Sequence, residues 1–378
     1  MTESPRGTRE EEFPELLAFL YRVFGRHVRP GIEVMYPTFF RRVPEALDNL
    51  FVLRENGRIV SHVGVQTQEA RVGDISLKLG FVGGVATDPD CRGRGYASTL
   101  MKHAIRTMRE REHDLSLLGG FRHYYERFGY EVGGGEFSFM VFLNCLRPKI
   151  KLPRCEVTAF KDVASSPAAP GELSEIWAAH ELEPWRARRS FEDCSLLLRV
   201  PNREVYRARS EGAPDALAYV VLAPPRWSVH GDWKQASIID FGGPCDLFLA
   251  LLRHLFTSEG YGLLWVHTPA VAHPIRDALL RAGQELYLGP IANVRVVNLR
   301  RLLEKMRLAM TRRLLASAAI VTGEVGMDVT DSEGMREQAT LVFQRDGVGV
   351  EKGCRGVRVQ ANSLALVRLL FGLDVPSR

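Results

Sequence analysis

The sequence predicts an α/β protein with mixed sheets, built from two similarly organised halves and a smaller α+β unit at the end. Helical and strand patterns alternate up to about residue 147, and a turn-rich stretch follows at 148–172. The order of helices and strands in the first half then recurs in the second half. We therefore expect domains at 1–147, 148–290 and 291–378.

The first half reads as strands interrupted by helices whose apolar residues recur at helical spacing. Its expected elements, in order, are a helix at 16–24, two strands at 50–70 around an Asn-Gly turn, a strand at 75–87, a helix at 98–112, a strand at 114–120, and a helix and strand at 122–132. The second half repeats this order from strand to helix. Its expected elements are strands at 215–225 and 235–243, a helix at 246–260, a strand at 262–268, and a helix and strand at 273–288.

The last unit begins with a basic helical stretch at 299–313, whose leucines recur at helical spacing. Turn-punctuated strands follow, and a helix is expected at 361–372. The basic residues of 299–313 are interpreted as the solvated face of an amphipathic helix. The unit is therefore expected to be a separate α+β domain.

Composition excludes several classes of protein. The 378 residues are 46% hydrophobic and 25% charged, as in soluble globular proteins, and neither a signal peptide nor a long apolar span is found. The net charge of +5 is spread among acidic residues, which argues against nucleic-acid binding. The six cysteines form no CxxC pair, which favours neither a disulfide framework nor a zinc site. We expect a cytoplasmic protein without a metal or a membrane contact.

A glycine-rich segment, RGRGYA at 92–97, lies where the apolar strand ends and the helix begins. The first N–H groups of a helix lack partners within it, and the helix dipole adds partial positive charge there. The glycines allow a close backbone approach, while Arg92 and Arg94 add charge. A cofactor bearing a diphosphate is the natural occupant. The residues alone leave its identity open, since the segment matches neither GxGxxG nor GxxxxGK[ST].

Two motifs in the expected order give a more specific indication. The segment 92–97 is similar to the R/Q-x-x-G-x-G/A pattern of the GCN5-related N-acetyltransferases (GNAT), and YERFGY at 125–130 resembles their Y-x-x-x-G-F/Y segment. Two acetyltransferase-like halves with a C-terminal domain similar to sterol carrier proteins resemble, more narrowly, the enhanced-intracellular-survival type. Beyond residue 150 this likeness rests on element order rather than on motifs.

The resemblance implies acetyl-CoA as cosubstrate. The strand Val85-Ala86-Thr87 would pair with the pantetheine arm, the turn would hold the pyrophosphate, and the next strand would splay near its end to admit the acetyl group. The implied cofactor-binding residues are Val85, Ala86, Thr87, Arg92, Gly93, Arg94, Gly95, Tyr96, Ala97, Ser98, Gly120 and Phe121.

The reaction requires an acid for the departing thiolate and a base for the amine. Tyr125 matches the family tyrosine, and a phenol with a pKa near 10 is protonated at neutral pH. The resemblance offers the terminal carboxylate, here that of Arg378, as base, although the chain ends in VPSR without a terminal aromatic and an exposed terminus is the simpler interpretation. Glu126 and an ordered water relay are the alternatives.

The second half lacks both motifs. It has FGGPCDLF in place of RGRGYA and no tyrosine at the second motif, so it is expected to be a structural, degenerate copy. His267 and His273 have no ligand-like neighbours and are interpreted as surface or core residues.

Two functions stay open: an N-acetyltransferase acting on a small-molecule amine or a lysine side chain, and a non-catalytic protein that senses CoA or binds an apolar ligand. The narrower resemblance also suggests a homo-oligomer.

Overall fold

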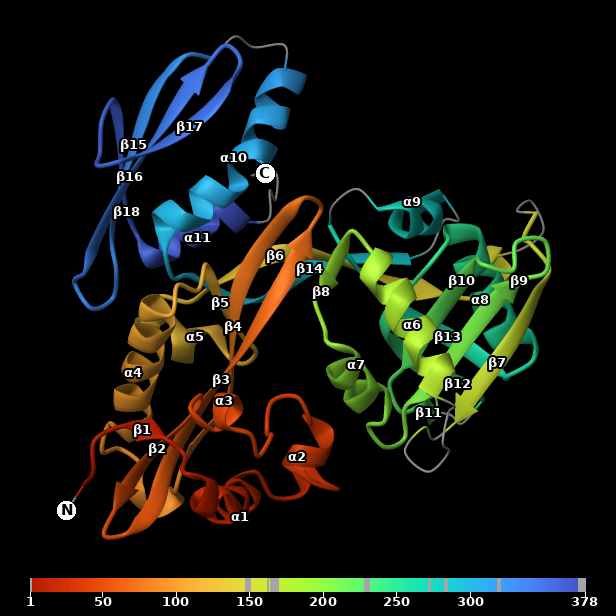
Figure 1. The fold of residues 1–378 in the computed structure, drawn as a ribbon, viewed down its shortest axis with the longest axis horizontal. Coiled ribbons are helices and arrows are strands. Elements are labelled where there is room, and N and C mark those ends of the chain that lie inside the picture. Colours follow the sequence, from red (N-terminus) through yellow and green to blue (C-terminus); the bar gives the residue numbers. More distant parts are fainter. Residues whose placement is uncertain are drawn as a thin grey trace. The chain divides into compact units, whose positions relative to one another are not determined.

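The structure is a computed structural model that describes residues 2–146, 151–161, 163, 170–227, 232–270, 273–281, 285–317 and 321–372. The chain forms two compact units (Figure 1). Unit 1 comprises Met1–Glu33, Phe39–Gly134 and Pro290–Arg378, and unit 2 comprises Val34–Thr38 and Gly135–Gly289. The first and last parts of the sequence therefore belong to one unit.

Unit 1 contains a mixed sheet with helices on both faces. Its helices are α1 (Phe13–Phe24), α2 (Ile32–Met35), α3 (Pro44–Leu47), α4 (Tyr96–Glu110) and α5 (Arg122–Tyr125). Its strands are β1 (Arg6–Gly7), β2 (Leu50–Glu55), β3 (Arg58–Val72), β4 (Ile75–Thr87) and β5 (Leu115–Leu118), followed by the end of β14 (Glu285–Val296). The sheet order is β1-β2-β3-β4-β5-β14, with β4 and β5 parallel and β14 antiparallel to β5.

These elements agree with the sequence predictions for the first half. The apolar run 75–87 is β4, and Asn56 and Gly57 form the turn between β2 and β3 with positive φ angles. The helix predicted from 98 begins earlier, at Tyr96, because Gly95 takes the left-handed conformation directly before it. Its apolar stripe, including Leu100 and Ala104, is fully buried against the sheet.

Unit 2 repeats this arrangement. Its helices are α6 (Pro170–Leu182), α7 (Phe191–Leu198), α8 (Cys245–Thr257) and α9 (Pro274–Arg281). Its strands are β7 (Cys155–Lys161), β8 (Trp185–Ala187), β9 (Glu204–Ser210), β10 (Leu217–Leu222), β11 (Arg226–Trp227), β12 (Lys234–Gly242) and β13 (Tyr261–Pro269), together with the end of β6 (Glu131–Val141). β12 and β13 are parallel, and β6 pairs antiparallel with β13, as β14 does with β5 in unit 1. Each unit thus completes its sheet with a strand that begins in the other.

The C-terminal residues of unit 1 form a second, smaller sheet. Its elements are α10 (Leu299–Ala316), β15 (Gly323–Thr330), β16 (Arg336–Gln344), β17 (Gly347–Lys352), β18 (Val357–Asn362) and α11 (Ser363–Phe371). The strand order is β17-β16-β15-β18, and both helices lie against the sheet (Figure 1). Alternate residues such as Met327 and Leu341 face the helices and share one core with Leu79 of β4. The core of this C-terminal sheet is therefore continuous with that of the first sheet.

A β-bulge interrupts β4 where its pairing with β3 shifts register. His62 pairs with Ala86 and Gly64 with Gly83, so two residues of β4 oppose one of β3. Gly84 adopts φ +62° in this bulge, a conformation that glycine reaches without strain. The Gly84 carbonyl leaves the ladder and accepts a hydrogen bond from Nδ1 of His62 at 2.7 Å. His62 is fully buried, and burial lowers its pKa to about 4.

The buried His62 predicts a loss of stability in acid. A histidine in the unfolded chain has a pKa near 6.5, so the unfolded state binds more protons between pH 6.5 and 4. The free energy of unfolding should fall as pH falls through this range, by about 3 kcal/mol from this side chain. His62→Asn keeps a donor for Gly84 and removes the titration. Urea unfolding at pH 7 and pH 4 should show a smaller acid loss in the variant, and equal losses would contradict the assignment.

Candidate functional site

A cavity of about 670 Å³ opens at the junction of β4 and α4. Its lining residues are Val23, Phe24, Val85, Ala86, Thr87, Cys91, Arg92, Gly93, Gly95, Tyr96, Ala97, Ser98, Tyr124 and Arg127. Nine of the twelve residues expected to bind the cofactor are among them; Arg94, Gly120 and Phe121 are not. The structure therefore gathers one strand end and one helix start around a single cavity.

The turn before α4 presents free backbone donors. Gly93 and Gly95 have φ angles of +78° and +80°, and no atom lies within 4 Å of where a Cβ would stand on either. No side chain caps the start of α4, which runs for 15 residues. The N–H groups of its first turn, from Tyr96 to Ser98, are therefore available to an anion at the positive end of the helix dipole.

Arg94 and Tyr96 hold the shape of this turn through one carboxylate. The Arg94 guanidinium donates to Oε2 of Glu55 at 3.0 Å, and the Tyr96 hydroxyl donates to Oε1 at 2.7 Å. The Tyr96 hydrogen bond, and then the charge of Arg94, lower the pKa of Glu55, although burial acts in the opposite direction. Arg94 is thus engaged with β2 and does not line the cavity, which leaves Arg92 as the arginine of the motif that does.

The edge of β4 is open above the cavity. Pairing between β4 and β5 runs from Leu79–Leu115 to Val82–Leu118 and ends there, while β4 continues to Thr87. Within the described residues, β4 has no strand partner on its β5 side beyond Val82. Its outward N–H and C=O groups can therefore pair with an extended ligand, as the edge of a sheet pairs with an added strand.

Tyr125 lies beside the end of β5. A Cβ on Gly120 would stand 3.0 Å from Cε2 of Tyr125, and the phenol ring makes an edge contact with Tyr124 at 4.9 Å between centroids. Within the described part of the chain, no residue hydrogen-bonds the Tyr125 hydroxyl. Burial raises the pKa of Tyr125, with a smaller contribution from Tyr124, so the hydroxyl is protonated at neutral pH. Tyr125 does not line the cavity itself, whereas its neighbour Tyr124 does.

The other residues considered for catalysis, and the two expected beside the acetyl group, either do not line the cavity or lie outside the described residues. Glu126 forms an ion pair with Arg122 at 2.9 Å on the surface of α5. Arg378, whose carboxylate was the expected base, lies outside the described residues. Phe121 is 79% exposed, and the Gly120 carbonyl accepts a hydrogen bond from Asn293 at 2.9 Å. The site therefore presents one candidate acid, while a base remains a prediction.

Five residues of the cavity wall were not predicted from the sequence: Val23, Phe24, Cys91, Tyr124 and Arg127. Val23 and Phe24 come from the end of α1, and Cys91 from the turn after β4. Arg127 lies with its guanidinium 4.5 Å from the centroid of the Tyr124 ring, and adds a second positive charge to the cavity. Arg127 stands inside the second motif, at a position that the motif leaves unspecified, so no pattern singled it out.

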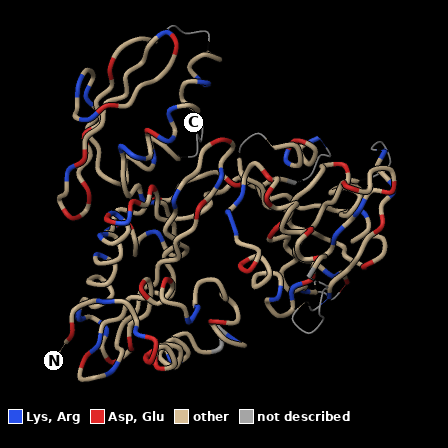
Figure 2. Tube along the Cα trace, viewed as in Figure 1, with Lys and Arg blue, Asp and Glu red and all other residues tan. Residues whose placement is uncertain are grey.

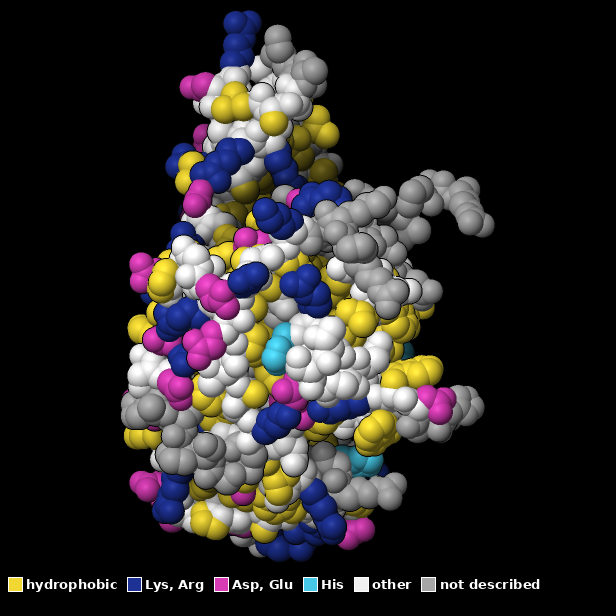
Figure 3. Space-filling view, turned by 90° about the vertical axis from the view of Figure 1, so that its right-hand side faces the viewer, with side chains coloured by type: hydrophobic (Ala, Val, Ile, Leu, Met, Phe, Trp, Pro, Cys, Tyr) yellow, Lys and Arg dark blue, Asp and Glu magenta, His cyan; other side chains and the backbone are white. Residues whose placement is uncertain are grey.

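No group of three or more His, Cys, Asp or Glu side chains suited to a metal ion occurs among the described residues. None of the helices in the described ranges is both long and apolar enough to cross a membrane. Basic and acidic residues alternate along the chain trace (Figure 2), and the face in Figure 3 carries lysines and arginines interspersed with acidic and apolar side chains. The interleaved charge inferred from the sequence is thus seen in the structure.

Comparisons with known proteins show which proteins the chain is similar to. Residues 4–133 match the model of a family described as an acetyltransferase (GNAT) domain. A structure described as a conserved protein of unknown function and probable N-acyltransferase, from Enterococcus faecalis V583, is 15% identical with a TM-score of 0.72, over 97% of this chain and 89% of that one. A GCN5-related N-acetyltransferase from Anabaena variabilis ATCC 29413 is 14% identical with a TM-score of 0.70, over 98% and 89%. Eis1 from Mycobacterium abscessus is 16% identical with a TM-score of 0.67, over 98% and 90%. No curated protein sequence matches the chain.

The N-terminal residues 4–133 are therefore similar to an acetyltransferase domain of the GNAT superfamily. The three structures share the fold of this chain over nearly its whole length, which extends the likeness beyond the matched domain. The predicted resemblance to this superfamily is confirmed. The roles of individual residues stay predictions.

The anion site at the start of α4 can be tested by charge alone. Ala97→Asp would place a carboxylate at the N-terminal turn of α4, where the helix dipole tolerates it but a bound diphosphate would be repelled. We expect CoA affinity to fall by roughly tenfold or more and thermal stability to be unchanged or slightly higher. Ala97→Asn, of the same size without the charge, is the control. Calorimetry giving equal CoA affinities for the two variants would contradict the site.

Proposed function

We propose that this protein is an N-acetyltransferase that transfers the acetyl group of acetyl-CoA to the primary amine of a small molecule or a lysine side chain. The observation that carries the proposal is the convergence of an open strand edge and an uncapped helix start on one cavity. The similarity of the N-terminal domain to the GNAT superfamily supports an acyl-CoA cosubstrate.

Each part of acetyl-CoA would have a matching group of residues in the cavity or beside it. The pyrophosphate would lie against the N–H groups of Gly93 to Ser98, with Arg92 and Arg127 supplying charge. The pantetheine amides would pair with the edge of β4 between Val85 and Thr87. The thioester would then lie near the point where β4 and β5 part, next to Gly120 and Tyr125.

Tyr125 supplies the proton that the reaction needs at sulfur. The amine nitrogen forms a bond to the acetyl carbon while the carbon–sulfur bond breaks, and the Tyr125 hydroxyl gives its proton to the leaving thiolate. The acceptor ammonium loses one proton to water before it attacks, and the second nitrogen proton, released as the amide forms, passes through water to the tyrosinate and restores Tyr125. The Tyr125 hydroxyl has no hydrogen-bond partner among the described residues, so it is free to donate to the sulfur, and its raised pKa means that it is protonated at neutral pH.

The alternative is a protein that binds CoA without catalysis, as a sensor of the cofactor or a carrier of an apolar ligand. A sensor has no use for a phenol beside the thioester, which favours the enzyme. Incubation with acetyl-CoA and a panel of polyamines, aminoglycosides and lysine peptides, with detection of free CoA thiol, tests the two. Binding of CoA without thiol release for any acceptor would favour the sensor.

The role of Tyr125 can be measured with two substitutions. Tyr125→Phe removes only the hydroxyl, so we expect intact CoA binding and folding and a loss of turnover of roughly 10² to 10⁴, the usual contribution of a positioned acid. Tyr125→Ala also removes the packed ring, and should lower the free energy of unfolding by several kcal/mol, roughly 3 to 5. A folded Tyr125→Phe variant with full turnover at saturating acetyl-CoA would rule out Tyr125 as the acid of the reaction.

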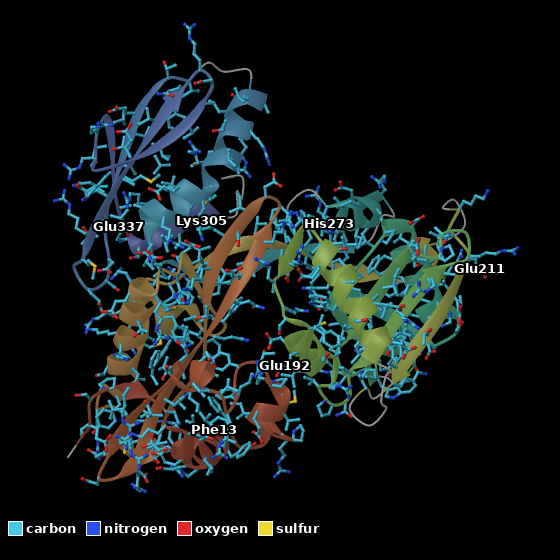
Figure 4. All side chains as sticks on the ribbon, viewed as in Figure 1. Phe13, Glu192, Glu211, His273, Lys305 and Glu337 are labelled. Carbon is cyan, nitrogen blue, oxygen red and sulfur yellow. The ribbon has the colours of Figure 1, made fainter. Side chains whose placement is uncertain are left out.

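We further propose that unit 2 is a degenerate acetyltransferase-like copy without a cofactor site. At the turn between β12 and α8, the N–H of Gly243 donates to Oε1 of Glu183 at 2.7 Å. Oε2 of Glu183 in turn lies 3.3 Å from Nε2 of His273, which precedes α9 (Figure 4). The Glu183 carboxylate therefore lies at the turn that corresponds to the proposed phosphate site of unit 1. Pro244, which has no N–H, directly follows Gly243 in this turn.

This arrangement predicts one CoA per chain. Unit 1 offers free donors at its helix start, whereas the Glu183 carboxylate already accepts from the corresponding turn of unit 2 and would repel a diphosphate. Isothermal titration with CoA should give a stoichiometry near one per chain, and Ala97→Asp should remove the heat of binding. A stoichiometry of two would contradict the degenerate assignment and restore unit 2 as a candidate catalytic domain.

The C-terminal sheet is proposed to be a sterol-carrier-like domain, on the basis of its element order and the shared fold of the structures compared. Met327, Leu341 and Leu366 pack together between its sheet and its helices, and the cavity that Leu366 lines has a volume of only about 140 Å³, which is too small for a sterol. We infer a structural rather than a lipid-binding contribution from this domain.

The homo-oligomer suggested by the resemblance remains a proposal, and sedimentation velocity tests it.

A further inference from the structure

Tyr125 lies in a segment too short to hold its own position. α5 has four residues, and the 3₁₀ turn that follows, Glu126–Phe128, has three. Helices of this length are not stable by themselves, because the cost of fixing the first turn is not recovered. The position of the Tyr125 hydroxyl is therefore set by the contacts made at the two ends of the segment.

One end is held by a buried carboxylate. Glu131, the first residue of β6, has a side chain that is only 1% exposed, and it accepts hydrogen bonds from two arginines. Arg122 of α5 donates to it through Nη2 at 2.8 Å, and Arg368 of α11 donates through Nε at 2.7 Å. A buried charge of this kind requires opposite charges around it. Glu131 thus ties the helix before Tyr125 to the last helix of the C-terminal domain.

The other end is held through Arg295, which is fully buried. Its Nη1 donates to the carbonyl of Phe128, and its Nη2 donates to Asp331 at 3.1 Å. Asp331 lies in the turn between β15 and β16 and also accepts from Arg109 of α4 at 2.9 Å. This chain of contacts runs from the C-terminal sheet to the turn that directly follows Tyr125.

The glycine of the second motif explains why these contacts can be so close. Gly129 has φ +77°, and a Cβ on it would stand 2.1 Å from Nη1 of Arg295 and 2.9 Å from Cβ of Ser363. Only glycine lets the start of α11 and the Arg295 guanidinium approach the backbone here. The C-terminal domain therefore reaches the Tyr125 segment at three places: Ser363 lies against Gly129, Arg368 pairs with Glu131, and Asp331 pairs with Arg295, which in turn binds the Phe128 carbonyl.

We propose that the C-terminal domain positions the acid of the reaction, with Arg368 and Asp331 as positioning residues that act through the two ends of the Tyr125 segment. The inference rests on the proposed role of Tyr125 in the transferase reaction. An acid must stand within hydrogen-bond reach of the sulfur, and a displacement near 1 Å can lower a rate by about 10². A domain without a substrate site of its own would in this way control turnover.

The test is Arg368→Met, which removes one of the two cations at Glu131 and leaves Arg122 in place. Turnover should fall by about tenfold or more, while the affinity for CoA is unchanged because the cavity at α4 is untouched. Arg368→Lys should restore part of the turnover, since the charge at Glu131 returns.

A matched control exists on the same domain. Arg301 of α10 donates to Asp114 at 3.0 Å, and Asp114 is fully buried and shares a second cation, Lys305 (Figure 4). Arg301→Met therefore also removes one of two cations from a buried carboxylate between the C-terminal and N-terminal domains. It does not touch the Tyr125 segment, so we expect turnover close to that of the unmodified protein.

The same substitution in a Tyr125→Phe background distinguishes positioning from general destabilisation. If Arg368 acts through the Tyr125 hydroxyl, Arg368→Met should lower turnover by less than about twofold once that hydroxyl is gone. Hydrogen–deuterium exchange gives a readout that needs no acceptor. The amides of residues 121–131 should exchange faster in Arg368→Met, and in Asp331→Asn, than in Arg301→Met.

Several outcomes would overturn the inference. These are unchanged turnover and exchange in Arg368→Met, an equal fall in both Tyr125 backgrounds, or an equal fall in Arg301→Met. Should Arg368→Met not fold, Arg368→Lys and Asp331→Asn carry the same comparison. A Tyr125→Phe variant with full turnover would instead remove the proposed acid, and this inference with it. A strong effect of Tyr125→Phe with none of Arg368→Met would remove the inference alone.

Discussion

The arrangement of unit 1 depends on backbone donors and acceptors that the protein does not satisfy itself. β5 ends at Leu118 while β4 continues to Thr87, and α4 begins without a capping side chain. Backbone groups withdrawn from water need partners, so a strand edge and a helix start that meet in one cavity suit a ligand with both amide and phosphate groups. The bulge at Gly84 is treated differently, because the carbonyl that it removes from the strand pairing accepts a hydrogen bond from His62.

Unit 2 repeats the topology, but one N–H of the corresponding turn has a partner within the unit. The N–H of Gly243, in the turn before α8, donates to Glu183, and the order of β12, α8, β13 and α9 is otherwise that of the first unit. The same fold is therefore compatible with a binding site or with a closed structural element. The difference lies in a few residues at one turn, which is why function must be argued from the site and not from the fold.

The sequence predicted the parts of the fold that depend on local patterns. The apolar run of β4, the Asn-Gly turn and the stripe of α4 follow from periodicity and turn chemistry. The two motifs led to the cavity, since both lie on contiguous segments. The exchange of β6 and β14 between the units could not be foreseen, because strand partners far apart in sequence leave no local pattern. For the same reason Val23, Phe24 and Arg127 were missed in the cavity wall, and Arg94 was expected there although Glu55 draws it away.

The buried carboxylates explain why the C-terminal domain belongs to the same compact unit as the N-terminal domain. Asp114 is fully buried at the start of β5, and its two cations, Arg301 and Lys305, both come from α10. Glu131 likewise draws one of its two arginines from α11. Removing the cation from a buried carboxylate costs more than the ion pair contributes, because the charge is left without compensation. The N-terminal domain therefore carries one buried charge, Asp114, whose two cations both come from the C-terminal domain, and a second, Glu131, that receives one of its two cations from there. Glu131 lies six residues after Tyr125, so the contact that completes its charge compensation also fixes the segment carrying the proposed acid. Stability and positioning at this site thus have one physical origin.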